Sequence, residues 1–269
     1  MAIASLKEMV EAGVHFGSAT ARWNPKMKPY IHSRMNKIHI INLKETLKGL
    51  IRSWHFILQT ASQGKKILFV GTKRQAGDII RQEAARAESH FVCNRWLGGT
   101  LTNMNTMRNR INRLLELEQL DKSGQLQEFS KKMIASLTRE RKKISRNFEG
   151  IRDMRELPGA VVVVDPATEH IAIAESVKLG IPVIGVIDTD DDPTLLDFVI
   201  PANDDAYRSI HYIVSRLADA AIEGKKRFAT QGALQQRAQA AQKKVEEKPI
   251  DTPDDFSKVG GFSYGGGEG

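Results

Sequence analysis

Apolar residues along the chain occur in two patterns, short continuous runs and helically spaced stripes. The continuous runs, rich in β-branched residues, predict buried strands at residues 37–41, 65–71, 90–93, 159–165, 182–188 and 197–201. Between them, apolar positions recur every three or four residues and predict helices at residues 43–62, 78–88, 169–180 and 204–226. Apolar strands that alternate with amphipathic helices form parallel sheets. The pattern therefore predicts the α/β class, a Rossmann-like parallel sheet with helices on both faces.

Residues 102–156 interrupt this alternation. Apolar residues here step by three, four or seven along two runs: Met104, Met107, Ile111 and Leu114, then Leu137, Ile144 and Ile151. Gly124 lies in a turn signal between the runs, so the segment predicts an antiparallel coiled-coil hairpin of two helices. We expect it to reach out from the domain, because its seam buries only its own apolar stripe.

The patterns divide the chain into three parts. A Rossmann-like α/β domain with a basic N-terminal strap takes residues 1–101 and 157–227, and the inserted hairpin takes residues 102–156. Residues 228–269 are rich first in Gln, Ala and Lys and then in Pro, Asp and Gly. Little of this segment can be buried, so we expect a flexible tail that is disordered beyond a helix ending near residue 247.

Composition narrows the class of protein. No apolar run approaches the roughly 18 residues that span a bilayer, and the first residues lack the layout of a signal peptide. The single cysteine, Cys93, excludes an internal disulfide and a cysteine-based metal cluster. We therefore expect a cytoplasmic protein that does not use a membrane.

Charge is sorted along the chain. The net charge is +8. Residues 1–155 hold 29 Lys or Arg against 13 Asp or Glu, a balance of +16, whereas residues 156–269 hold 11 against 19, a balance of −8. Such sorting indicates that the first part faces a polyanion, and a nucleic acid is the partner it favours.

The first forty residues form a basic strap with aromatic rings between the cations. Lys and Arg contact phosphates, and flat rings stack on unpaired bases or sugars. The candidate RNA contacts in the strap are Arg22, Trp23, Lys26, Lys28, Arg34 and Lys37. The alternative is a surface strap whose rings cover an edge of the core, and both roles can hold at once.

A second basic region lies in the hairpin. Residues 105–155 hold 13 Lys or Arg against 7 Asp or Glu, and "TRERKKISR" is the densest basic patch of the chain. The candidate RNA contacts here are Arg108, Arg139, Arg141, Lys142 and Lys143. The alternative is an ordinary solvated face of a coiled coil.

The stretch "NRWLGGTLTN", residues 94–103, stands where the hairpin begins. Its two glycines allow close approach or an unusual backbone conformation, and Thr100 or Thr102 is expected to cap the first hairpin helix. Arg95 offers a forked donor for phosphate oxygens. Trp96 either stacks on RNA or wedges the base of the hairpin onto the sheet. We include Arg95, Trp96 and Asn103 among the candidate RNA contacts.

The stretch "FVGTKRQAGD", residues 69–78, combines a strand, a glycine turn and a helix start. A phosphate could bind at this helix N-terminus beside Lys73 and Arg74, which are candidate RNA contacts. The alternative is a nucleotide-binding α/β enzyme that uses the Gly71–Gly77 turn. However, the glycine spacing fits neither nucleotide-binding fingerprint, which favours a tight strand-to-helix connection.

An acidic cluster follows the strand at residues 182–188. If "GVHFG" folds nearby, His15, Asp188, Asp204 and Asp205 are candidate ligands of a structural divalent metal. Alternatively, these carboxylates cap helices or pair with basic groups. No Ser/His/Asp or Cys/His grouping is supported by its local motif, so we expect no catalytic residue, no required cofactor and no small-molecule substrate.

Several motifs occur in one order along the chain, among them "GVHFG", "RWNPKMKPYI", "KILFVGTKRQA", "RWLGGTLTN", "EHIAIAESVKLGIPVIGVIDTDDDP" and "FVIPANDDA". Over residues 3 to about 226 the chain resembles the bacterial-type small-subunit ribosomal protein two family. The resemblance implies a Rossmann-like sheet with an inserted coiled-coil hairpin and no catalytic activity. It also implies contacts to 16S-type ribosomal RNA near the junction of head and body, and a role in docking ribosomal protein one beside other neighbouring ribosomal proteins.

Two residues depart from the family pattern. Ser18 stands where many relatives have His, which removes one potential metal ligand, and Met133 stands where relatives often carry an acid. The sequence thus favours a non-enzymatic, rRNA-binding structural constituent of the small ribosomal subunit. A third interpretation, a coiled-coil adaptor that binds only protein, predicts that the purified chain ignores RNA at low salt.

Overall fold

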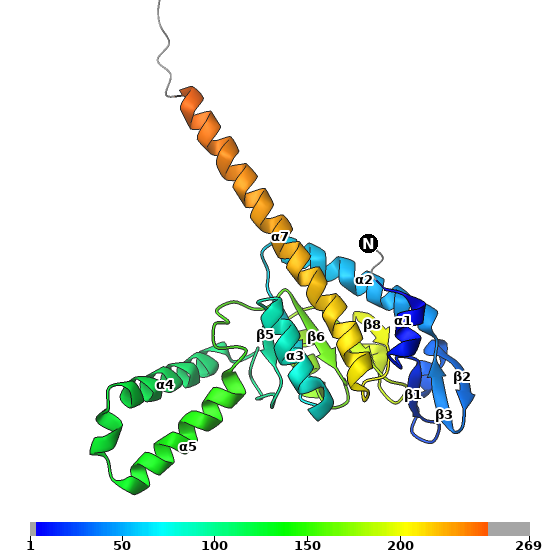
Figure 1. Ribbon diagram of the computed structural model, residues 1–269, viewed down its shortest axis with the longest axis horizontal. Coiled ribbons are helices and arrows are strands. Elements are labelled where there is room, and N and C mark those ends of the chain that lie inside the picture. Colours follow the sequence, from blue (N-terminus) through cyan, green and yellow to red (C-terminus); the bar gives the residue numbers. More distant parts are fainter. Residues whose placement is uncertain (1–3, 247–269) are drawn as a thin grey trace, which may run out of the picture. The chain divides into compact units, whose positions relative to one another are not determined.

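A parallel sheet forms the centre of the α/β fold in this computed structural model, which describes residues 4–246 (Figure 1). Within that range, five strands pair in the order β5-β4-β6-β7-β8, and every pairing is parallel. The strands are β4 (Ile67–Val70), β5 (His90–Val92), β6 (Ala160–Val164), β7 (Val183–Ile187) and β8 (Phe198–Pro201). The predicted parallel sheet is confirmed.

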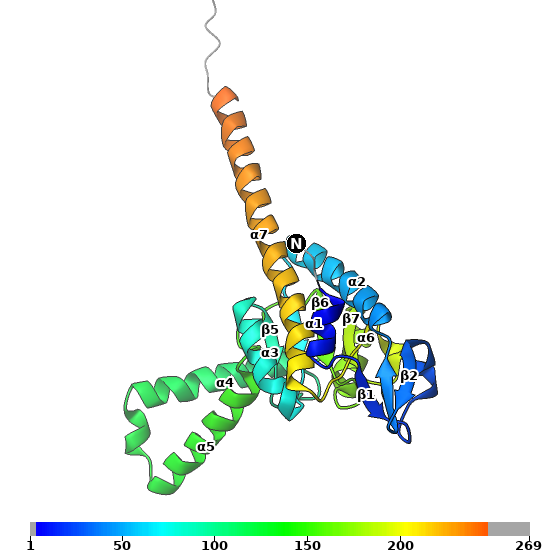
Figure 2. The same ribbon diagram turned by 45° about the vertical axis from the view of Figure 1, so that its right-hand side comes forward.

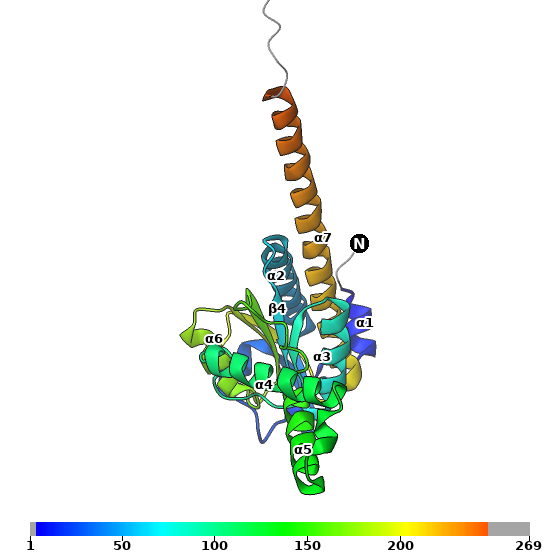
Figure 3. The ribbon, with the colours of Figure 1, turned by 90° about the vertical axis from the view of Figure 1, so that its left-hand side faces the viewer.

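Helices cover both faces of the sheet, as predicted. In β4, Ile67 and Phe69 join a core formed with α1 (Leu6–Glu11), α2 (Leu43–Ser62), α3 (Arg74–Arg86) and the first part of α7 (Tyr207–Glu246). Leu68 and Val70, which point to the other face, join a second core with α6 (His170–Lys178) and the base of the hairpin. Figure 3 shows α6 on one side of the strands and α1 and α3 on the other.

The chain divides into two units, residues 1–228 and residues 229–269. Helix α7 begins at Tyr207 and ends at Glu246, so the helix expected at residues 204–226 and the helix expected to end near residue 247 are one continuous helix. The expected disorder of the tail concerns residues 247–269, which lie outside the described residues. The functional site described below lies entirely in the first unit.

The N-terminal strap is more regular than expected and forms a sheet of its own. Among the described residues, this antiparallel sheet has three strands in the order β1-β3-β2: β1 (Phe16–Ala19), β2 (Ile31–Met35) and β3 (Ile38–Ile41). A 3-10 helix, η1 (Pro25–Tyr30), lies between β1 and β2.

The strand predicted at residues 37–41 is confirmed as β3, but its assignment to the parallel sheet is wrong. Asn36 and Lys37 both adopt positive φ, 50° and 64°. Two consecutive residues of this kind make the two-residue turn that joins antiparallel strands. The turn pairs β3 with β2, so the parallel sheet begins only at β4.

The inserted segment forms the predicted helical hairpin (Figure 2). Its helices are α4 (Met104–Lys122) and α5 (Lys131–Phe148), and Gly124, with a φ of 78°, precedes the short η2 (Gln125–Glu128) between them. Met107, Leu114 and Ile144 are buried in the seam, but they share one core with sheet residues. The base of the hairpin thus packs onto the sheet and is not held by its own stripe alone. That the two helices supercoil stays a prediction.

Candidate nucleic-acid interface

The loop that leads into the hairpin is held by one buried carboxylate, that of Glu175 on α6. Its Oε1 accepts hydrogen bonds from the Trp96 indole Nε1–H (3.1 Å) and the Gly99 N–H (2.7 Å). Its Oε2 accepts from the Leu101 N–H (3.0 Å), the Thr102 N–H (3.0 Å) and the Thr102 hydroxyl (3.1 Å). Burial raises the pKa of Glu175, but these hydrogen bonds outweigh it and leave the pKa below its usual value. Sequence reasoning missed Glu175.

This arrangement decides the roles left open for residues 94–103. Trp96 is 8% exposed and lies in the core beside Leu101, so it wedges the base of the hairpin onto the sheet. Gly99 has a φ of +89°, a conformation that favours glycine. The expected threonine cap is wrong: Asn103 is the N-cap of α4, and its side chain accepts a hydrogen bond from the Thr106 N–H. The Thr100 hydroxyl instead donates to the Leu97 carbonyl.

Most of the predicted RNA-contacting cations are exposed and lack an acidic partner. Within the described residues, no ion pair is formed by the following exposed side chains: Arg22, Lys28, Arg34, Lys37, Arg74, Arg95, Lys142 and Lys143. Four of them lie in the strap and two on α5, while Arg74 and Arg95 lie at the start of α3 and in the loop before α4. Unpaired cations are the groups that remain available to phosphates.

The other predicted RNA-contacting side chains interact with groups of the protein itself. Lys26 pairs with Asp192 at 2.6 Å and Arg141 pairs with Asp121 across the hairpin. Arg108 donates to the Arg155 carbonyl at 2.8 Å. The remaining cases are the Arg139 side chain, which donates to the Ala135 carbonyl, and the Trp23 ring, which packs 5.3 Å from the His39 ring.

At the crevice where the strand order reverses, between β4 and β6, the side chain of Lys73 is paired with three carboxylates. Its ammonium group lies 2.6 Å from Asp205, 3.0 Å from Asp204 and 3.4 Å from Asp165. Burial lowers the pKa of Lys73, but these carboxylates raise it well above its usual value. Lys73 is therefore paired within the protein and less available to a phosphate than the unpaired cations, and its contact with RNA stays a prediction.

The pKa of Asp204 moves in the opposite sense from that expected of a carboxylate paired with a lysine, because burial disfavours its charged form. Burial raises the pKa of Asp204 to about 7, and Asp165 adds to the rise although Lys73 opposes it. Burial likewise raises the pKa of Asp191 to about 7. At Asp204 the effect of burial thus outweighs the attraction of the Lys73 ammonium group.

The same crevice is unsuited to a nucleotide. The Thr72 N–H, two residues before α3 begins, donates to the Glu169 carboxylate at 2.5 Å, so an acidic group lies beside the helix N-terminus where a phosphate would be received. Gly71 is required by packing, since a Cβ there would collide with Ile80. At Gly77, the second glycine of the turn, an added Cβ would lie 3.2 Å from the Cys93 carbonyl oxygen. The two glycines thus serve a tight strand-to-helix connection.

Of the candidate metal ligands, Asp188, Asp204 and Asp205 lie together, with carboxylate oxygens within 4.8 Å of one another. A second group of the described residues consists of Asp165, Asp191 and Asp204, and neither group includes His15. The His15 ring instead lies 4.1 Å from the Phe16 ring. Ser18 donates hydrogen bonds to Asp188 from its backbone N–H (3.0 Å) and its hydroxyl (2.9 Å).

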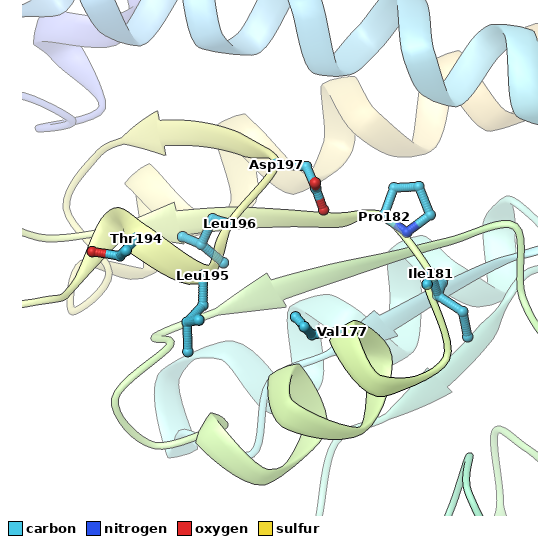
Figure 4. A pocket seen from close by; sticks show the side chains of 8 residues that line it. Val177, Ile181, Pro182, Thr194, Leu195, Leu196 and Asp197 are labelled. Carbon is cyan, nitrogen blue, oxygen red and sulfur yellow. The ribbon is translucent and has the colours of Figure 1, made fainter.

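A groove of about 310 Å³ lies between α6 and the segments that precede β7 and β8 (Figure 4). Its lining is mainly apolar, from Val177, Ile181, Pro182, Leu195 and Leu196. The polar side chains in the lining are those of Thr194 and Asp197, and Asp197 accepts a hydrogen bond from the Val183 N–H. Such a set offers no nucleophile with an adjacent base, so the groove has no catalytic constellation.

These features define a class of α/β protein. At the crevice where nucleotides bind in related folds, Lys73 is paired with carboxylates, and unpaired cations are exposed on the strap and on the helical hairpin of α4 and α5, called the arm below. The chain belongs to the Ribosomal protein S2 family, whose sequence profile matches residues 9–224. It is 49% identical over 241 residues to the small ribosomal subunit protein uS2 of Rhodopirellula baltica, covering 90% of this chain and 92% of that protein. The resemblance seen in the motifs is thereby confirmed.

Family membership settles the question of catalysis. The Ribosomal protein S2 family is non-enzymatic, so the nucleotide-dependent enzyme is excluded. Among the described residues, no helix combines the length and the apolarity that crossing a membrane requires.

Proposed function

We propose that the chain is a structural constituent of the small ribosomal subunit and that it binds 16S-type ribosomal RNA near the junction of head and body. The observation that carries this proposal is the family match together with the exposed, unpaired cations of the strap and arm. Such cations displace counterions from folded RNA, so the affinity falls steeply as salt rises. The strap and the arm supply separate sets of phosphate contacts.

Co-sedimentation tests this proposal. The chain is added to a lysate and to purified small-subunit rRNA, and its position in a sucrose gradient is compared with that of the free chain. We expect it to travel with the small subunit and to bind the rRNA at low salt. A chain that joins the subunit but ignores RNA at low salt would instead support the protein-binding adaptor.

We further propose that neighbouring ribosomal proteins, including ribosomal protein one, dock on the acidic part of the chain. The assembled subunit, with this chain in it, is proposed to work in the cytoplasm. Asp190, Asp192 and Asp197 are exposed in the acidic part, and Leu195 between them is 58% exposed. Carboxylates repel phosphates, so this surface favours protein over RNA. Immobilised chain should retain purified ribosomal protein one, and an Asp190→Lys, Asp197→Lys variant should retain less. Equal retention would contradict the docking proposal.

We also propose that no resident metal is needed. The carboxylates of Asp204 and Asp205 already hold the Lys73 ammonium group, and Asp188 is satisfied by Ser18 and Thr189. A divalent ion at Asp188, Asp204 and Asp205 would have to displace Lys73. We expect Mg²⁺ or Zn²⁺ at about 1 mM to leave Tm unchanged. This concentration is on the order of the dissociation constants of weak extracellular cation sites. A saturable rise in Tm would revive the metal site.

A further inference from the structure

Glu175 joins two segments that lie far apart in the sequence. It is one of the buried residues of α6, whose neighbours Ala172 and Ile173 lie in the core against the sheet. Its five donors among the described residues all belong to residues 96–102, immediately before the N-cap of α4 at Asn103. The loop immediately before α4 is therefore hydrogen-bonded to a helix that packs on the sheet.

We propose that Glu175 is the positioning residue of the RNA-binding arm. It does not touch RNA; it fixes the direction in which α4 leaves the sheet and so the location of the unpaired cations on α5. The inference rests on the proposed function. Arg95, one residue before Trp96, is held by the same loop, so Glu175 also places this cation.

The apolar contacts at the base of the arm cannot set its direction by themselves. Leu101, Met107 and Phe148 pack in one core with Leu68 and Val70. Apolar burial is non-directional, whereas hydrogen bonds to a buried charged group have a narrow geometry. Where α5 returns to the domain, three polar contacts hold its end: the Asn94 amide donates to the Arg146 carbonyl at 2.9 Å, Arg81 pairs with Glu149 at 3.1 Å, and the Phe91 N–H donates to the Gly150 carbonyl at 3.1 Å. Glu175 supplies the corresponding contacts at the start of α4.

The chemistry of the loop requires a carboxylate at this position. Every group that faces Glu175 donates, two groups to one oxygen and three to the other. A glutamine has the same shape but offers one oxygen and an NH₂ group. Its NH₂ must therefore face at least one backbone N–H, and the buried donor is left without a partner. An apolar or amide replacement would release the loop while leaving α4 and α6 intact.

The test compares Glu175→Gln with Glu83→Gln in the full-length chain. Glu83 is also 8% exposed, but it contacts Arg86 and His211 and none of residues 96–102. Both variants lose one buried carboxylate. Amide hydrogen exchange, the Trp96 indole N–H resonance and affinity for small-subunit rRNA are measured at a temperature where both variants remain folded.

For Glu175→Gln we expect faster exchange at Gly99, Leu101 and Thr102, a shifted Trp96 indole resonance, and rRNA affinity about tenfold weaker than wild type. Exchange within α4 and the sheet should stay protected. Glu83→Gln should change none of these readouts. Equal rRNA affinity for the two folded variants would overturn the inference, even if the loop amides exchange faster.

A second variant keeps the inference falsifiable if Glu175→Gln does not fold. Thr102→Val removes one donor, the hydroxyl, and leaves the other four. We expect a smaller loss of rRNA affinity, about threefold, with faster exchange confined to residues 99–102. Unchanged affinity in this variant would overturn the inference. Failure of the wild-type chain to bind rRNA would instead contradict the proposed function.

Discussion

At the scale of single residues, the Lys73 ammonium group lies among carboxyl groups that outnumber it. Removing the cation from such a cluster leaves buried charges without compensation, which costs far more than breaking an exposed pair. Because the carboxyls can instead take up protons at acid pH, the cost depends on pH. Lys73 therefore contributes most where Asp204 is ionised.

The variant Lys73→Met tests this dependence. In the wild type, burial raises the pKa of Asp204 to about 7, above its unfolded value of 3.8. The folded state then binds more protons between about pH 4 and pH 7, so the free energy of unfolding falls as pH rises through this window. Without Lys73 the fall becomes larger. Urea unfolding should show a loss of about 3 kcal/mol at pH 8 and a smaller loss at pH 5.

Lys48→Met is the matched control for Lys73→Met. Lys48 pairs with Glu45 at 2.7 Å, but its side chain is 60% exposed, so we expect little change in the free energy of unfolding at either pH. An equal loss for Lys73→Met at pH 5 and pH 8 would contradict the role assigned to the carboxylate cluster.

Single-residue roles were only partly predictable from the sequence. The exposure of Arg22, Lys28 and Lys142 follows from their polar surroundings, and the structure agrees. The roles of Glu175 and Lys73 depend on partners more than 70 residues away in the sequence. No local pattern marks such pairs, since a lone Glu on an amphipathic helix has the same spacing whether or not it is buried against a loop.

At the scale of elements, the apolar pattern was most reliable where burial dominates. Helix α2 has the predicted bounds, and β4, β6 and β7 lie within the predicted runs because continuous apolar residues are buried on both faces. Strand β3 was assigned to the wrong sheet, since its partner is decided by the turn at Asn36 and Lys37. Pairing depends on turn geometry, which the apolar pattern does not contain.

The hairpin offers a test at this scale, because neighbouring leucines on α4 differ in burial. Leu114 is 2% exposed in the core shared with the sheet, whereas Leu115 is 44% exposed. We expect Leu114→Ala to lower the free energy of unfolding by about 3 kcal/mol through the lost burial and the cavity it leaves. Leu115→Ala should cost well under about 1 kcal/mol. Similar losses in urea titrations would contradict the burial of Leu114 in this core.

At the scale of the whole molecule, the fold sorts cations into those that pair with the protein's own carboxylates and those that remain unpaired. Lys26, Lys73 and Arg141 belong to the first group, and Arg22, Lys28 and Lys142 to the second. The distribution of charge along the sequence cannot make this distinction, although it indicates which part of the chain is basic. A phosphate contact should therefore depend on where a cation lies and not on the total charge.

Two charge-reversal variants with the same net charge test this sorting. The first combines Arg22→Glu with Lys28→Glu in the strap, and the second combines Lys178→Glu on α6 with Arg208→Glu on α7. Each variant removes two exposed cations. We expect the strap variant to weaken rRNA binding at least about tenfold and to reduce the slope of log affinity against log salt by about two. Equal effects of the two variants in filter-binding assays would favour a purely non-specific attraction.

Lysine acetylation of the free chain and of the assembled small subunit, followed by mass spectrometry, tests most directly whether the strap and arm face RNA. If their ammonium groups bind phosphates, assembly should protect four lysines by about tenfold or more: Lys28, Lys37, Lys142 and Lys143. Lys48 and Lys178 should stay reactive. Strap and arm lysines that remain reactive in the subunit, while Lys48 and Lys178 are protected, would contradict the assignment of the RNA-binding surface.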